Sequence, residues 1–108
     1  MLGSFYEKSS KEFNVTIRKA GSLQNIVSDT VKLYLHDISD SSEALEVSAD
    51  VTSEGASGIA KFAITPTQLT ITPQKYIATI EWVQSSNKYI LVREYINVET
   101  KYINEDAS

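Results

Sequence analysis

The side chains best suited to catalysis or metal binding lie close together in residues 36–43. His36 is the only histidine of the chain, and Asp37, Asp40 and Glu43 follow it at intervals of three residues. A histidine can act as the base of a serine triad, and carboxylate oxygens at this density can bind calcium. However, nearby serines such as Ser39 belong to a loop, and neither a Gly-x-Ser-x-Gly motif nor an EF-hand pattern occurs. We therefore expect a solvated histidine and a solvated acidic loop.

Other hydrolytic and metal chemistries have equally little support. A single histidine without any cysteine cannot supply the usual ligands of a zinc site. The 14 aspartates and glutamates could include a glycosidase pair, but such enzymes need a deep cleft, which a small sandwich rarely provides. We therefore predict no catalytic residue, no metal and no cofactor, and expect that the protein is not an enzyme.

Aromatic side chains offer sugar binding as a further chemistry. Tyrosine and tryptophan bind with little loss of side-chain entropy, and Tyr34, Trp82 and Tyr89 are the candidates for a stacking platform. Trp82 and Tyr76, however, lie on the apolar phase of one alternating segment, which predicts that both belong to the core. Carbohydrate binding is therefore the alternative to a role in protein binding.

The overall composition bounds the partners. The chain has 108 residues, of which 42% are hydrophobic and 22% charged, as in one soluble domain. The net charge of -4 would repel nucleic acid. The sequence does not open with a basic segment followed by an apolar run, and no stretch approaches about 18 apolar residues. We expect no signal peptide, no membrane contact and synthesis in the cytoplasm.

Alternation of apolar and polar residues with a period of two predicts six strands. The alternating segments are 12–18, 30–37, 45–51, 60–64, 75–84 and 88–98. Turn residues separate them, and no helical stripe is present. The pattern predicts an all-β fold, an antiparallel immunoglobulin-like sandwich of two sheets with about six to seven strands. A small barrel is the alternative architecture.

The turns predict how these strands are connected. The glycine-containing residues 53–58 predict a hairpin of the third and fourth segments, and the polar residues 85–87 predict a hairpin of the last two. Pro66 and Pro73 bracket a connection, because proline cannot donate to a central strand ladder. Leu69, within this connection, should plug the end of the core.

The sandwich is expected to span residues 11–103. Residues 1–10 are polar apart from three side chains, and residues 104–108 are small and acidic. Neither end can bury enough apolar surface to offset the entropy lost on ordering. We therefore expect a flexible N-terminal arm and a flexible acidic tail.

Several short motifs occur in the order typical of a known family. They are the alternation of Phe13, Val15 and Ile17, the segments Thr30-Val-Lys-Leu-Tyr-Leu35 and Ile59-Ala-Lys-Phe-Ala-Ile64, Pro73-Gln-Lys-Tyr76, and the closing Tyr95-Ile-Asn-Val98. Over residues 11–98 the chain resembles the immunoglobulin-like domains of tailed-phage virion proteins, above all the N-terminal domain of upper baseplate proteins. It departs from that family at Lys75, where the family has glycine, and in the turn 85–87, which lacks glycine.

The resemblance implies a structural module of a phage virion, in the baseplate, in the tail or associated with the capsid. The partners would be other virion proteins or further copies of the chain itself. The family has no catalytic or cofactor residue that could be carried over to this sequence.

The last predicted hairpin has apolar residues on both faces. Ile77, Val83, Tyr89 and Leu91 are apolar at positions that simple alternation would leave in water, whereas antiparallel sheets usually keep one face polar. Either a loop covers this second face or it is a contact patch. We predict that these four residues form an assembly interface, which makes the protein a non-catalytic assembly module.

The phase of the final strand is ambiguous. Glu94 falls on the same face as apolar residues of segment 88–98, and a bulge near Arg93 and Glu94 would remove this conflict.

Overall fold

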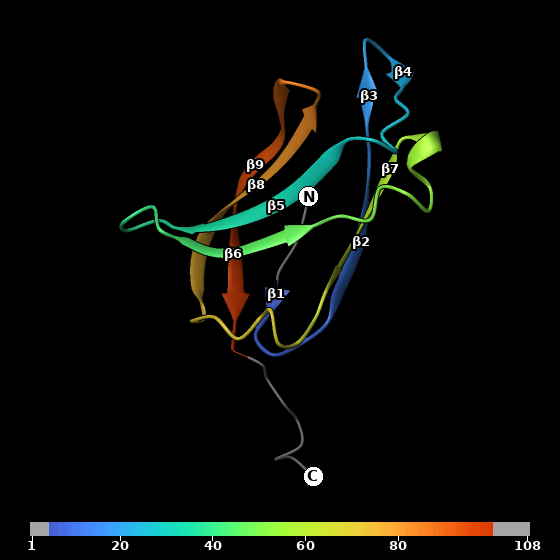
Figure 1. The fold of residues 1–108 in the computed structure, drawn as a ribbon. Helices are drawn as coiled ribbons and strands as arrows, with labels where there is room; N and C mark the ends of the chain where they lie inside the picture. Colours follow the sequence, from blue (N-terminus) through green and yellow to red (C-terminus); the bar gives the residue numbers. More distant parts are fainter. Residues whose placement is uncertain (1–4, 101–108) are drawn as a thin grey trace.

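The computed structural model describes residues 5–100, which form nine β-strands and one 3-10 turn, η1 (Figure 1). The elements are β1 (Phe5–Tyr6), β2 (Lys11–Thr16), β3 (Arg18–Lys19), β4 (Ser22–Leu23), β5 (Thr30–Asp37), β6 (Glu43–Ser48), η1 (Gly55–Ser57), β7 (Ile59–Ile64), β8 (Gln74–Gln84) and β9 (Asn87–Glu99). The predicted all-β class is confirmed, and each of the six predicted segments overlaps an observed strand. Within the described residues, no helix has the length and apolar character needed to cross a membrane.

The strands form one large and two small sheets. The large sheet has the order β1-β9-β8-β5-β6, in which β1 runs parallel to β9 and all other neighbours are antiparallel. β2 pairs with β7 in a second, antiparallel sheet, and β3 and β4 form a short hairpin at the top of Figure 1.

Alternation along the strands places the core between the two main sheets. In β5 the side chains of Val31, Leu33 and Leu35 are at most 1% exposed, while those between them are half-buried. One buried cluster joins such side chains from β5, β6, β8 and β9 with those from β2 and β7. Burying each large apolar side chain stabilises the fold by about 1.5–3 kcal/mol. The architecture is therefore β-sandwich-like.

Two predicted connections are confirmed. β8 and β9 form an antiparallel hairpin through the two-residue turn Ser85 and Ser86. The connection between the prolines contains no strand, and its Leu69 is fully buried in the core. The Leu69 carbonyl oxygen also accepts a hydrogen bond from the backbone N–H of Lys8 at 2.9 Å.

The predicted hairpin of the third and fourth segments is wrong. β6 pairs with β5 and β7 pairs with β2, and only a bridge between Asp50 and Lys61 joins the two segments. The Asp50 carboxylate accepts four hydrogen bonds from N–H and O–H groups of Thr52 and Ser53, which bend the chain after β6. Gly58 then enters β7 at a φ of 81°, and a Cβ there would lie 3.0 Å from a backbone oxygen. The intervening segment therefore carries the chain from one sheet to the other.

The N-terminal segment is partly packed on the sandwich. Phe5 and Tyr6 pair with the end of β9, and the Phe5 side chain is fully buried. The backbone N–H of Glu7 donates to the carbonyl oxygen of Glu99 at 3.0 Å. The folded unit therefore includes residues that the sequence assigns to a flexible arm, whereas the expected acidic tail, 104–108, lies outside the described residues.

Candidate functional site

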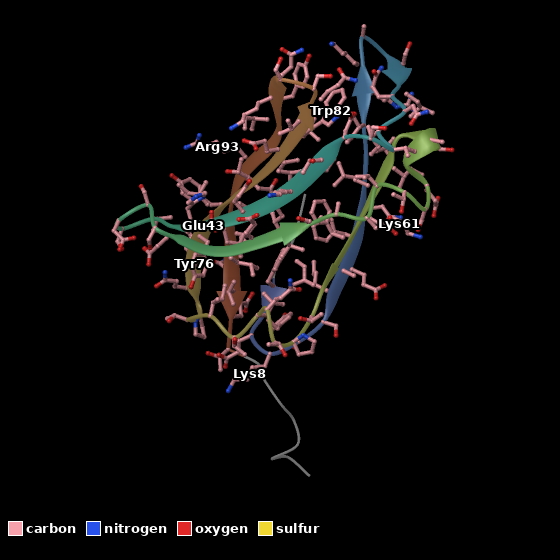
Figure 2. The ribbon with its side chains drawn as sticks, in the orientation of Figure 1. Lys8, Glu43, Lys61, Tyr76, Trp82 and Arg93 are labelled. Atoms are coloured by element: carbon pink, nitrogen blue, oxygen red, sulfur yellow. The ribbon has the colours of Figure 1, made fainter. Side chains whose placement is uncertain are left out.

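The outer face of the five-stranded sheet is the face turned away from β2 and β7. Successive strand residues point to opposite faces, so every second residue of β5, β6, β8 and β9 points outward. Strand pairing aligns these residues in three rows across β9, β8, β5 and β6: Tyr95, Ile77, His36 and Glu43; Arg93, Thr79, Tyr34 and Glu46; Ile90, Glu81, Lys32 and Ser48. Figure 2 shows Arg93 and Glu43 on the side of the molecule opposite Lys61 of β7.

Exposed side chains of β9 form a ridge on this face. Tyr95 is 66% exposed and Ile90 is 55% exposed, the two highest values among the large hydrophobic side chains of the described residues. Arg93 lies between them on the same face, and the Nζ atom of Lys75 lies 5.8 Å from the centre of the Tyr95 ring. We call Ile90, Arg93 and Tyr95 the ridge. The ridge is therefore the most exposed apolar part of the outer face among the described residues.

Beside the ridge, the outer face has a hollow of about 450 Å³. The hollow is lined by Tyr34, His36, Ser41, Glu43, Ile77, Thr79, Glu81 and Arg93. The Tyr34 and His36 rings stack with their centres 6.0 Å apart and 27° between their planes. The hollow therefore combines aromatic, apolar and hydrogen-bonding groups, and its volume is typical of binding pockets.

The charges of the outer face are only partly paired. The Lys32 ammonium donates to a Glu46 carboxylate oxygen at 2.9 Å, and this hydrogen bond and the carboxylate charge raise the pKa of Lys32. Burial is the main cause that raises the pKa of Tyr34, so its hydroxyl stays protonated and can donate. Within residues 5–100, neither Arg93 nor Glu43 has an ion-pair partner. Both groups are therefore available to a binding partner.

The structure divides the predicted assembly residues between the two faces. Ile77 and Val83 lie on the outer face of β8, where both are half-buried. Tyr89 and Leu91 instead pack against the core cluster. The four residues therefore do not form one continuous strip.

A bulge in β9 explains this division. Ile80 of β8 pairs with Val92, whereas the next residue, Glu81, pairs with Ile90. Leu91 is therefore the extra residue of the bulge, and the alternation of β9 changes phase there. As a result, Ile90 points outward and residues before it change faces.

The bulge precedes the predicted position near Arg93 and Glu94, and it turns Tyr89 toward the core. The ring centres of Tyr89 and Trp82 are 4.8 Å apart, and the Lys19 ammonium donates to the Tyr89 hydroxyl at 3.0 Å. Trp82 is 2% exposed, which confirms that it is a core residue. Sequence reasoning missed Ile90 because the conflict at Glu94 signals a bulge without locating it, and it missed Tyr95 although simple alternation places that residue on the outer face.

Three of the candidate catalytic and metal-binding residues, His36, Asp37 and Asp40, have structural contacts instead. His36 stacks against Tyr34 in the wall of the hollow. The Asp37 carboxylate accepts hydrogen bonds from Ser39 and from the Gln74 side chain, and those from Ser39 are the main cause that lowers the pKa of Asp37. Across residues 5–100, no group of three or more histidine or acidic side chains could hold a metal ion.

Comparisons with known proteins found no match for this chain among family models, curated proteins or solved structures.

Proposed function

We propose that this protein is a non-catalytic structural module of a phage virion that acts through protein contacts of its outer face. The observation that carries the proposal is the ridge, whose two apolar side chains are more than half exposed next to a hollow on the same face. Since the other face of this sheet forms the core, the ridge has no role in folding that would account for it. Exposed apolar groups of this kind are typical of surfaces that bind partners.

The order of the strands supports an immunoglobulin-like topology for the sandwich. In immunoglobulin-like domains strands B and E pair in one sheet, and strands C, F and G share the other. β2 and β7 correspond to B and E, and β5, β8 and β9 correspond to C, F and G. β6, beside β5, then corresponds to the additional C′ strand of variable-type domains.

The virion context is supported by the sequence motifs that resemble immunoglobulin-like domains of tailed-phage proteins. Those motifs lie on β2, β5, β7, β8 and β9, which are the strands of the proposed topology. The same motifs are core and turn positions, so they support a structural role and leave the location in baseplate, tail or capsid to experiment.

Carbohydrate binding is the second candidate function. Of the three aromatic residues considered for it, Trp82 and Tyr89 pack together in or against the core, so only Tyr34 lies on the outer face. Tyr34 and His36 line the hollow together with charged groups that could bond sugar hydroxyls. A glycan array tests this candidate directly, since protein contacts alone predict no bound sugar.

The proposed function is tested by assembly of particles. The chain is co-expressed with its neighbouring reading frames, the particles are purified, and their proteins are quantified by mass spectrometry. We expect the wild-type chain in the particles, and we expect the double variant Ile90→Lys and Tyr95→Glu to fold but to be missing from them. The control is Ala63→Lys, which places a charge on the exposed side of β7 and should not affect incorporation.

Two results would contradict the proposal. One is the absence of the wild-type chain from the particles. The other is incorporation of the ridge double variant at the level of the wild type.

A further inference from the structure

The ridge and the hollow lie side by side on one surface. The ridge is on β9, while the hollow is centred on β8 and β5 and extends to Arg93 of the ridge on one side and to Glu43 of β6 on the other. Because neighbouring strands are about 4.8 Å apart, the ridge and the centre of the hollow are separated by about 7 Å. A protrusion and a depression at such a short distance can meet their own counterparts in a second molecule.

We propose that the outer face binds a second copy of this chain through a two-fold axis that runs along β8 between the two faces. This inference rests on the proposed contact function of the outer face and identifies its partner. A two-fold axis in this position places the ridge of each copy over the hollow of the other. The interface is therefore isologous, and both hollows are filled by one operation.

The charges support this arrangement. Arg93 of the ridge lies at the β9 edge of its own hollow, whose lining also includes Glu43 of β6 and Glu81 of β8. Within residues 5–100 neither Arg93 nor Glu43 has an ion pair in its own chain. When the ridge enters the hollow of the second copy, Arg93 reaches these carboxylates, and the symmetry forms the contact twice. Such opposite charges also fix the orientation of the two copies.

The apolar groups agree with the same docking. Tyr95 of one copy meets the side chains of Ile77 and His36 in the hollow of the other, and Ile90, in the row of Glu81 and Lys32, packs on the aliphatic part of Lys32. These contacts remove from water the two most exposed large hydrophobic side chains among the described residues. Aromatic groups in a pocket at the centre of an interface contribute most of its affinity.

The area of the face predicts a weak dimer. Three strands at their usual spacing and about seven residues of length give about 350 Å² on each copy, less than half of the usual 800 Å². Association is therefore expected only at high local concentration. A symmetric assembly with many copies supplies that concentration.

The test is a charge exchange between Arg93 and Glu43 in sedimentation velocity from about 10 μM to about 1 mM, the range that an interface of this size requires. Wild-type protein should change from monomer to dimer over this range. Arg93→Glu alone and Glu43→Lys alone should each remain monomeric, because each places like charges across the interface. An equimolar mixture of the two variants should dimerise again, because only the mixed pair restores opposite charges at both contacts. Misfolded variants could not give this result.

The inference is overturned if the wild-type chain stays monomeric throughout, or if the mixture remains as monomeric as its components. Its failure can be told apart from failure of the proposed function. A monomeric wild-type chain together with exclusion of the ridge double variant from particles would leave the contact function standing with a different partner. Incorporation of that double variant would contradict the contact function itself.

Discussion

Replacing Phe5 by alanine measures how firmly the N-terminal segment is packed on the sandwich. Phe5 is fully buried, its ring centre lies 6.4 Å from that of Phe13 in an edge-to-face contact, and the Lys11 ammonium lies 5.0 Å from its centre. Removing a buried phenylalanine costs about 3–5 kcal/mol, because the transfer energy is lost and a cavity remains. β1 has only two residues at the edge of the sheet, so it can detach and limit the loss. We therefore expect Phe5→Ala to lower the free energy of unfolding by about 2–4 kcal/mol.

The assay is equilibrium unfolding in urea, followed by the fluorescence of Trp82, the only tryptophan. The control is Tyr6→Ala on the same strand, whose side chain is 46% exposed, and it should cost less than about 1 kcal/mol. For Phe5→Ala the midpoint of the unfolding transition should shift to a lower urea concentration. The slope of the free energy of unfolding against urea concentration should change little. Equal stability of Phe5→Ala and the wild type would refute the reasoning, because the segment would then be the flexible arm that its composition predicts.

Three further perturbations test other parts of the structure. Ser85 has a φ of 55° in the β8–β9 turn, so thermal unfolding should show that Ser85→Gly raises stability by about 0.5 kcal/mol, while Ser86→Gly does not. Hydrogen bonds from neighbouring hydroxyl and amide groups lower the pKa values of Asp37 and Asp50; their contribution to stability is therefore complete at neutral pH and decreases as the pH falls below about 4, the usual aspartate pKa. When the pH is lowered, the Asp50→Asn variant should accordingly lose less stability than the wild type does. The Trp82 indole N–H donates to Asp29 at 2.9 Å, so urea unfolding should show that Asp29→Ala costs about 1–2 kcal/mol, whereas Asp29→Asn, which keeps an acceptor, costs less.

The strands of this fold could be predicted because each has a simple local pattern. The alternation of Val31, Leu33 and Leu35 depends only on the two faces of a strand, and the predicted segment 30–37 coincides with β5. The same holds for Trp82, whose apolar phase predicted its place in the core. Local periodicity therefore identified the elements and most of the core.

Partner strands could not be predicted from local pattern in the same way. The residues before β7 contain glycines typical of a hairpin, yet Asp50 and its hydrogen bonds to Thr52 and Ser53 bend the chain toward the other sheet. The choice between a hairpin and a crossing depends on which edges of the distant strands β2 and β5 are free to pair. This information is distributed over the whole chain.

The candidate site was predicted only in part for a related reason. Ile77 and Val83 follow simple alternation and lie on the outer face, as expected. The bulge at Leu91 exchanges the faces of the residues before it, which moved Tyr89 to the core and Ile90 to the ridge. A single extra residue thus changed half of the predicted surface, and the composition of β9 does not show where it lies.

The most direct test of the central claim is the reactivity of single cysteines in assembled particles. The chain has no cysteine, so Thr79→Cys, at the centre of the outer face, and Thr16→Cys, on the exposed side of β2, can each be labelled alone with a maleimide. Both should react readily in the isolated domain. In particles we predict that Thr79→Cys is protected, because a partner covers the outer face, while Thr16→Cys reacts as before. Equal reactivity of Thr79→Cys in the particle and in the free domain would contradict the account.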